Sequence, residues 1–168
     1  MNRPLLICDC DEVLLHMMAP FQGWLTEVRG VDFDFGRGEF VDCFRRPCGA
    51  AMDEAQIWAL LDDFFTTEMH RQPVVPGATD ALARIAAVAD IVILTNLEDH
   101  HGDRRAVQLA GHAMPYRVVT NQGPKGRAAK RIAGELGAGA IVFVDDLPQH
   151  HASMAQHLPD AARLHMIA

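Results

Sequence analysis

The stretch Leu5-Leu6-Ile7-Cys8-Asp9-Cys10-Asp11-Glu12-Val13-Leu14 decides how the rest of the chain is interpreted. Its first four residues carry no charge and predict a short strand buried on both faces. Because strand side chains alternate, Asp9 and Asp11 would leave on the same side if the extended conformation continues. Carboxylates at the carboxyl end of a buried parallel strand lie where open α/β sheets place their active sites. An acidic turn without function is the alternative that this stretch alone leaves open.

Two further apolar runs end in polar residues in the same way. Residues 91–94 (IVIL) are followed by Thr95-Asn96, and residues 141–144 (IVFV) are followed by Asp145-Asp146. The remaining periodicity predicts helices at 79–89, 103–112, 127–136 and 149–157, and strands at 116–120 and 162–167. Strands that alternate with helices of about ten residues predict right-handed βαβ units, and hence an α/β fold with a parallel sheet.

A segment of about 60 residues separates the first strand from this regular remainder. It contains both tryptophans and most phenylalanines, a broken helical pattern at its start and a helix that begins near Asp53. We therefore predict a small, mostly helical cap at 16–75, inserted into a core formed by 1–15 and 76–168. An insertion that starts beside the end of the first strand could cover the active edge as a lid. Its aromatic side chains are expected mainly in the core of the cap, with a specificity pocket as the alternative.

The composition and net charge limit the classes of molecule that the protein is expected to bind. A hydrophobic fraction of 49% is ample for a packed core, and a charged fraction of 22% is ordinary for a globular domain. The net charge of −7 argues against nucleic acid and anionic membranes as partners. No apolar run reaches the ~18 residues of a membrane span, and no signal peptide is evident, so a cytoplasmic protein is expected. A small phosphorylated metabolite remains a suitable partner if a metal ion offsets the local charge.

Carboxylates, a hydroxyl and an ammonium are predicted to meet at one edge of the sheet. The residues that supply these groups are Asp9, Asp11, Thr95, Lys125, Asp145 and Asp146. Carboxylates bind Mg²⁺, which also accepts phosphate oxygens as ligands. One carboxylate can act as a nucleophile and its neighbour as a general acid and base. The hydroxyl and the lysine can hold the charge of a transferring group, so the set indicates metal-assisted phosphoryl transfer.

Taken in order, these motifs resemble those of the haloacid dehalogenase superfamily. Asp9-Cys10-Asp11-Glu12-Val13 is similar to its first motif and residues 91–96 to its second, while Lys125 matches the third and Val144-Asp145-Asp146 the acidic fourth. The resemblance implies a Rossmann-like parallel sheet with helices on both faces, and a small cap inserted after the first motif. Glu12 departs from the pattern, because glycine usually occupies that position.

The resemblance also implies a role for each motif residue. Asp9 would be the nucleophile that forms an aspartyl-phosphate, and Asp11 the general acid and base. Substrate contacts would come from Thr95, Asn96 and Lys125. The Mg²⁺ ligands would come from Asp9, Asp145 and Asp146 and from the backbone carbonyl of Asp11. Of the last two, Asp146 is favoured as the direct ligand and Asp145 as the partner that orients the site, although the sequence leaves this choice open.

The sequence therefore predicts a Mg²⁺-dependent phosphatase acting on a small phosphomonoester, with a nucleotide as one candidate substrate. A phosphomutase or phosphotransferase with the same intermediate is the nearest alternative, and a non-catalytic binding protein is another. Lys130 is a second, less favoured candidate for the lysine. Arg104-Arg105 could contact an anionic group of the substrate, but exposure to solvent is the favoured interpretation. Zinc binding by His100-His101 or His150-His151 is disfavoured, because adjacent residues do not share a helix face.

Overall fold

The computed structural model describes residues 2–166. Residues up to Leu15, together with those from Val74 onward, form one compact unit, the core unit; His16–Pro73 form a second, the inserted unit. No helix in the described part of the chain is long and apolar enough to cross a membrane. The last predicted strand, 162–167, is observed over Ala162–His165, and position 167 lies outside the described residues.

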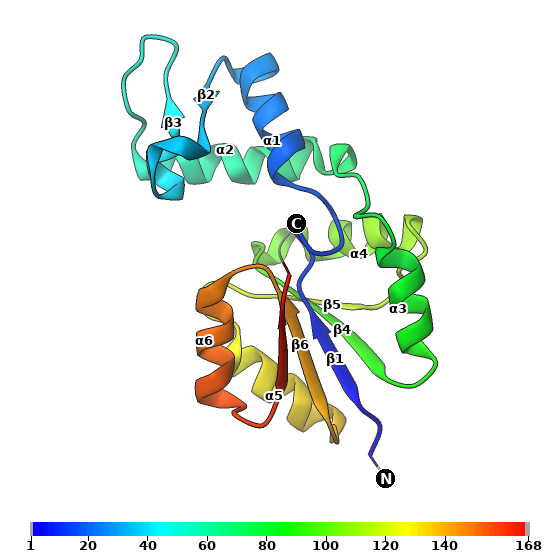
Figure 1. Ribbon diagram of the computed structural model, residues 1–168. Helices are drawn as coiled ribbons and strands as arrows, with labels where there is room; N and C mark the ends of the chain where they lie inside the picture. Colours follow the sequence, from blue (N-terminus) through cyan, green and yellow to red (C-terminus); the bar gives the residue numbers. More distant parts are fainter. Residues whose placement is uncertain (1, 167–168) are drawn as a thin grey trace. The chain divides into compact units, whose positions relative to one another are not determined.

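A five-stranded parallel sheet forms the centre of the core unit, in the order β5-β4-β1-β6-β7 (Figure 1). The strands are β1 (Leu5–Cys8), β4 (Asp90–Thr95), β5 (Arg117–Thr120), β6 (Ile141–Asp145) and β7 (Ala162–His165). Cys8 pairs with Ile93 of β4 on one side and with Val144 of β6 on the other. The three apolar runs therefore end side by side, and the predicted α/β fold is confirmed.

Helices cover both faces of this sheet. They are α3 (Ala78–Ala86), α4 (Gly102–Gly111), α5 (Gly126–Leu136) and α6 (Pro148–His157). Cys8 packs in the apolar layer that includes residues of α3 and α4, whereas Ile7 packs in the layer that includes residues of α5 and α6. Because alternate side chains enter opposite layers, β1 has to be apolar on both faces, which explains its uncharged sequence.

The turn after β1 is tight and contains a left-handed residue. Glu12 has a φ of 59°, and its backbone N donates to Leu15 O at 2.8 Å. The backbone N of Leu14 donates in turn to Cys10 O at 2.8 Å. A side chain in this conformation costs roughly 1 kcal/mol relative to glycine. Glu12 thus adopts the backbone conformation for which glycine is usual, and the turn forms in spite of the substitution.

The start of α5 is fixed by a close approach to α6. A Cβ on Gly126 would lie 2.4 Å from Ser153 O, so only glycine fits without displacement. The backbone N of Gly126 also donates to Ser153 Oγ at 3.0 Å. Lys125 directly precedes this contact, and its backbone position follows from it.

The inserted unit combines helices with a small sheet. Its helices are α1 (Met18–Trp24), continued by a π-helical turn (Leu25–Arg29), and α2 (Glu54–Thr67). Two strands, β2 (Asp32–Phe33) and β3 (Phe44–Arg45), pair antiparallel, a feature that the pattern of a mostly helical cap did not predict. Single helical turns cover Phe35–Arg37, Phe40–Cys43 and Met69–Arg71; in the core unit, one covers Asp99–His101.

Aromatic side chains form the core of the inserted unit. The buried ones are Phe21, Trp24, Phe33, Phe44, Phe64 and Phe65. Phe21 lies near the middle of the set, with its ring centroid 5.2 Å from that of Phe64. Phe35 and Trp58 are exposed instead. Of the aromatic residues of this segment, these two are therefore available at the surface of the unit.

Candidate active site

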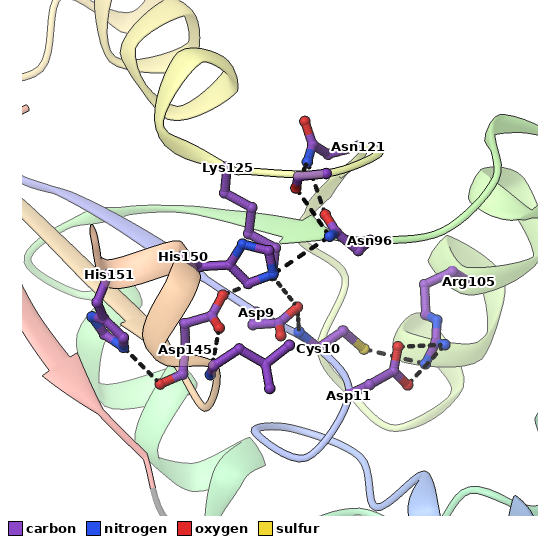
Figure 2. A network of polar contacts seen from close by, with 12 residues as sticks. Asp9, Cys10, Asp11, Asn96, Arg105, Asn121, Lys125, Asp145, His150 and His151 are labelled. Carbon is purple, nitrogen blue, oxygen red and sulfur yellow. Dashed lines mark hydrogen bonds and ion pairs between the residues drawn. The ribbon is translucent and has the colours of Figure 1, made fainter. Parts of the chain in front are cut away.

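Asp9, Lys125 and Asp145 form a buried chain of charged groups at the carboxyl edge of the sheet (Figure 2). Lys125 Nζ lies 2.6 Å from Asp9 Oδ1 and 2.7 Å from Asp145 Oδ2. The side chains of Lys125 and Asp145 are fully buried, and that of Asp9 is 8% exposed. A buried ammonium with two carboxylate partners is held in one place, because losing either contact would leave a charge uncompensated.

Burial and the neighbouring charges shift the pKa of Asp9 toward neutral pH. Burial raises the pKa of Asp9 to about 7; Lys125 opposes the rise and Asp145 adds to it. Burial alone would lower the pKa of Lys125, but the carboxylates of Asp9 and Asp145 more than offset this, and its pKa is raised. Asp9 Oδ1 also accepts a hydrogen bond from the backbone N of Cys10 at 2.7 Å. Perturbed carboxylates of this kind are typical of catalytic sites.

Three carboxylates are grouped closely enough to share a metal ion. One oxygen from each of Asp9, Asp145 and Asp146 lies within 4.8 Å of the others. Hard carboxylate oxygens are the protein ligands that Mg²⁺ prefers, so the chemistry of this donor set suits that ion. Burial and the neighbouring Asp145 also raise the pKa of Asp146, to about 6. A bound cation would therefore favour the ionised forms of Asp9 and Asp146 at neutral pH, against the raised pKa of each.

The two adjacent acids after β6 have different surroundings. Asp145 Oδ2 contacts Lys125, and Asp145 Oδ1 accepts a hydrogen bond from the backbone N of Leu147 at 2.9 Å. Asp145 O lies 3.0 Å from His151 Nε2, which donates to it (Figure 2). Both carboxylate oxygens of Asp145 thus already have donors, whereas Asp146 is half-buried at the surface of the site.

Thr95 and Asn96, which follow β4, differ in how their polar atoms are used. Thr95 is fully buried, and its Oγ1 has no hydrogen-bond partner in the described part of the chain. Such an unpaired buried group costs about 1–3 kcal/mol unless a bound molecule, such as a ligand or water, accepts its hydrogen bond. Asn96 is exposed, and its amide links loops: its Oδ1 accepts from Asn121 Nδ2 at 2.8 Å, and its Nδ2 donates to Gly123 O at 3.1 Å.

His150 is a site residue that sequence reasoning considered only for zinc. It is buried at the start of α6, with its Nε2 3.4 Å from Asn96 Nδ2 (Figure 2). Burial and the nearby Lys125 ammonium lower the pKa of His150, which favours a neutral imidazole. The metal-compatible group around Asp9 contains no histidine. His150 therefore belongs with the polar lining of the site.

Asp11 faces a partner that the sequence did not reveal. Arg105 Nη2 lies 3.0 Å from Asp11 Oδ1 and 3.2 Å from Asp11 Oδ2, and Arg105 Nη1 donates to Cys10 Sγ at 3.2 Å. Arg105 is fully buried, so the expectation of a solvent-facing side chain is wrong for it; Arg104 is exposed. The two residues are 94 positions apart, and the sequence around neither of them indicates the contact. Lys130, the second candidate lysine, is exposed on α5.

Comparisons with known proteins place this site in a known fold. No protein-family model and no curated protein sequence matches the chain. A haloacid dehalogenase-like hydrolase from Streptococcus pneumoniae superposes with a TM-score of 0.71 at 10% identity, over 98% of this chain and 85% of that one. A protein from Lactobacillus plantarum, assigned as a phosphoglycolate phosphatase, gives a TM-score of 0.65 at 14% identity, over 95% and 84%.

A third solved structure has a metal ion. It is the N-terminal part of a Bacteroides fragilis protein, containing a phosphatase domain complexed with Mg; the TM-score is 0.50 at 16% identity, over 99% of this chain and 36% of that one. At these identities the likeness concerns the fold. The strand order, the insertion after β1 and the structural matches agree with the motifs read from the sequence. The chain has the fold of the haloacid dehalogenase-like hydrolases.

Proposed function

We propose that the protein is a Mg²⁺-dependent phosphatase that hydrolyses a small phosphomonoester through an aspartyl-phosphate on Asp9. The observation that carries this proposal is the buried contact of Asp9 with Lys125, beside the acids Asp145 and Asp146. The structural relatives support it, because one is assigned as a phosphoglycolate phosphatase and another contains a phosphatase domain with bound Mg.

The reaction proceeds in two halves. First, a carboxylate oxygen of Asp9 attacks phosphorus, the bond from phosphorus to the leaving oxygen breaks, and that oxygen takes its electron pair and a proton from Asp11. Then a water oxygen attacks the phosphorus, the bond from phosphorus to Asp9 breaks, and Asp11 accepts the proton of the water. The products are an alcohol and inorganic phosphate, and both aspartates return to their starting forms.

The surrounding groups stabilise charge during these steps. The unpaired hydroxyl of Thr95 donates to a phosphoryl oxygen, and the ammonium of Lys125 favours the ionised form of Asp9 against the opposing effect of burial. Mg²⁺ would be held by Asp9, Asp146 and the backbone carbonyl of Asp11. When bound, the ion supplies positive charge that offsets the charge of the phosphoryl group. Asp145 takes part mainly by holding Lys125, because both of its oxygens already accept hydrogen bonds.

The inserted unit is proposed to act as a cap and to contribute substrate specificity. The chain leaves the core unit after Leu15 and re-enters it at Val74, and these two residues form an antiparallel bridge just beyond the turn that contains Asp11. The insertion point therefore lies close in the chain to the proposed acid. A unit attached there can exclude water from the site when it closes over a substrate.

The experiment that tests the proposal is hydrolysis of p-nitrophenyl phosphate with and without Mg²⁺, by the natural protein and by Asp9→Asn. We expect Mg²⁺-dependent turnover that Asp9→Asn abolishes. Asp80→Asn, an exposed aspartate on α3, is the matched control and should retain full activity. Full hydrolysis by Asp9→Asn would show the assignment of the nucleophile to be wrong. Transfer of the phosphoryl group to an added sugar hydroxyl rather than to water would favour a phosphomutase or phosphotransferase.

A further inference from the structure

We infer that Arg105 is a positioning residue for the proton-transfer step: it fixes the carboxylate of Asp11 on the side of the first motif opposite Lys125. This inference rests on the proposed function and adds to it a residue from outside the motifs. The observation behind it is the pair of contacts from Arg105 to Asp11 and Cys10.

Two separate cations hold the two aspartates of the first motif. Lys125 Nζ contacts Asp9 Oδ1 at 2.6 Å, whereas Arg105 Nη2 contacts both oxygens of Asp11, at 3.0 and 3.2 Å. In Figure 2 the side chains of Asp9 and Asp11 point to these different partners. Accordingly, the described group of metal-compatible carboxylates contains Asp9 but not Asp11. The carboxylate of Asp11 is thus kept apart from the metal-compatible group.

Arg105 also contacts Cys10, the residue between the two aspartates. Its Nη1 donates to Cys10 Sγ at 3.2 Å, and the backbone N of Cys10 donates to Asp9 Oδ1 at 2.7 Å. The guanidinium is planar and its donors are rigidly spaced, so contacts from two of its nitrogens fix orientation as well as distance. The path from Arg105 through Cys10 therefore reaches both aspartates.

Because Arg105 is buried, it can position Asp11 but cannot bind the substrate directly. Its side chain is 0% exposed, while that of Asp11 is 18% exposed. A substrate can therefore approach Asp11, but it meets Arg105 only through the residues that Arg105 holds. Burying an arginine is costly unless its charge is paired, and here the pairing partner is the proposed acid itself.

The expected effect depends on how much the leaving group needs a proton. General acid catalysis contributes roughly 10²–10⁴-fold, and a small misplacement of a catalytic group can cost on the order of 10²-fold. p-Nitrophenolate departs readily without a proton, whereas phenolate benefits from one. An Arg105 variant that misplaces Asp11 should therefore slow phenyl phosphate hydrolysis more than p-nitrophenyl phosphate hydrolysis, although the two substrates have similar shapes.

The experiment compares kcat for these two substrates in the natural protein, Arg105→Met and Asp11→Asn. We expect Arg105→Met to lower the phenyl to p-nitrophenyl ratio about ten-fold or more, in the same direction as Asp11→Asn. In Asp11→Asn/Arg105→Met the ratio should fall no further than in Asp11→Asn alone, because the two residues act as a unit. Arg131→Met, an exposed arginine on α5, is the matched control and should leave the ratio unchanged.

A purely structural role gives a different result. Equal loss on both substrates, or a further fall of the ratio in the double variant, would overturn the inference. If Arg105→Met does not fold, as judged by circular dichroism, Arg105→Lys serves in its place; it keeps a cation but cannot reach Asp11 and Cys10 with separate nitrogens. Failure of the proposed function is distinguishable: in that case the natural protein hydrolyses neither substrate, or Asp9→Asn retains activity.

Discussion

Lys125 Nζ lies 2.6 Å from Asp9 Oδ1, although one residue precedes α5 and the other follows the central strand of the sheet. The contact depends on the parallel arrangement of β1 and β6 and on the close approach of α5 to α6. It joins the stability of the core unit to the proposed chemistry, so substitutions at this point should affect both.

Replacement of Lys125 by Met should be strongly destabilising. It leaves Asp9 and Asp145 buried without their cation, and breaking a buried pair costs about 3–5 kcal/mol. Urea denaturation at pH 8 measures the loss in free energy of unfolding. Lys130→Met removes an exposed lysine from α5, the helix that Lys125 precedes, and should change stability by no more than about 0.5 kcal/mol. Equal effects of the two substitutions would contradict the assigned role of Lys125.

The metal-free protein should lose stability as the pH rises. The pKa of Asp9 is about 7 in the folded protein and about 3.9 when unfolded. Between these values the folded state binds more protons, so the free energy of unfolding decreases from pH 4 to pH 7. Asp146, with a pKa of about 6, contributes in the same direction.

Urea midpoints measured with a chelator at pH 5 and at pH 8 test this expectation. Asp9→Asn should show a smaller decrease between the two pH values, since the titrating group is gone. Mg²⁺ should raise the midpoint at pH 8 more than at pH 5, because protons compete with the ion for the same oxygens. A midpoint that rises from pH 5 to pH 8 in the chelated natural protein, and equally in Asp9→Asn, would contradict it.

Thr95→Val should separate stability from activity. It removes a buried hydroxyl that has no partner, so the free energy of unfolding should stay unchanged or rise by about 1 kcal/mol. Loss of a donor to the phosphoryl group should lower kcat by about 10²–10³-fold. Thr79→Val is the opposite case, because Thr79 Oγ1 donates to His112 O at 3.2 Å. That variant should lose about 1 kcal/mol of stability and keep its activity.

Two glycines of α5 should respond to alanine in opposite ways. In Gly126→Ala the new Cβ would meet Ser153 O at 2.4 Å, and we expect a loss of about 1–3 kcal/mol and lower activity, because Lys125 is displaced. In Gly134→Ala the Cβ meets nothing within 4 Å, and removal of a helical glycine should stabilise by about 1 kcal/mol. Thermal unfolding of both variants measures the difference.

The sequence predicts the core unit well because its strands are buried on both faces. The uncharged residues Leu5 to Cys8 could only be covered by helices on two sides, and the structure has them there. The acids and the lysine lie at element ends, where register is set by the pairing of Cys8 with Ile93 and Val144. Asp53 likewise was expected near the start of a helix, and it caps α2 through the backbone N of Gln56.

What the sequence could not show depends on contacts between distant segments. The pairing of Asp11 with Arg105 requires the packing of α4 against the turn after β1, and two neighbouring arginines look alike until one of them is buried. Strands β2 and β3 contain two residues each, too few for an alternating pattern to be recognised. The lack of a hydrogen-bond partner for Thr95 Oγ1 among the described residues likewise depends on the residues that pack around it and not on its neighbours in sequence.

The central place of β1 also has a consequence for how the proposed activity is lost on heating. β1 has a hydrogen-bonded strand on each side, and the backbone N of Asp9 donates to Val144 O at 2.9 Å. Amide protons in such a strand exchange with solvent only when the whole unit opens, whereas edge strands and surface turns open locally. We therefore expect the proposed nucleophile to lie in the slowest-exchanging part of the core unit. Inactivation by gentle heating should follow global unfolding and not precede it.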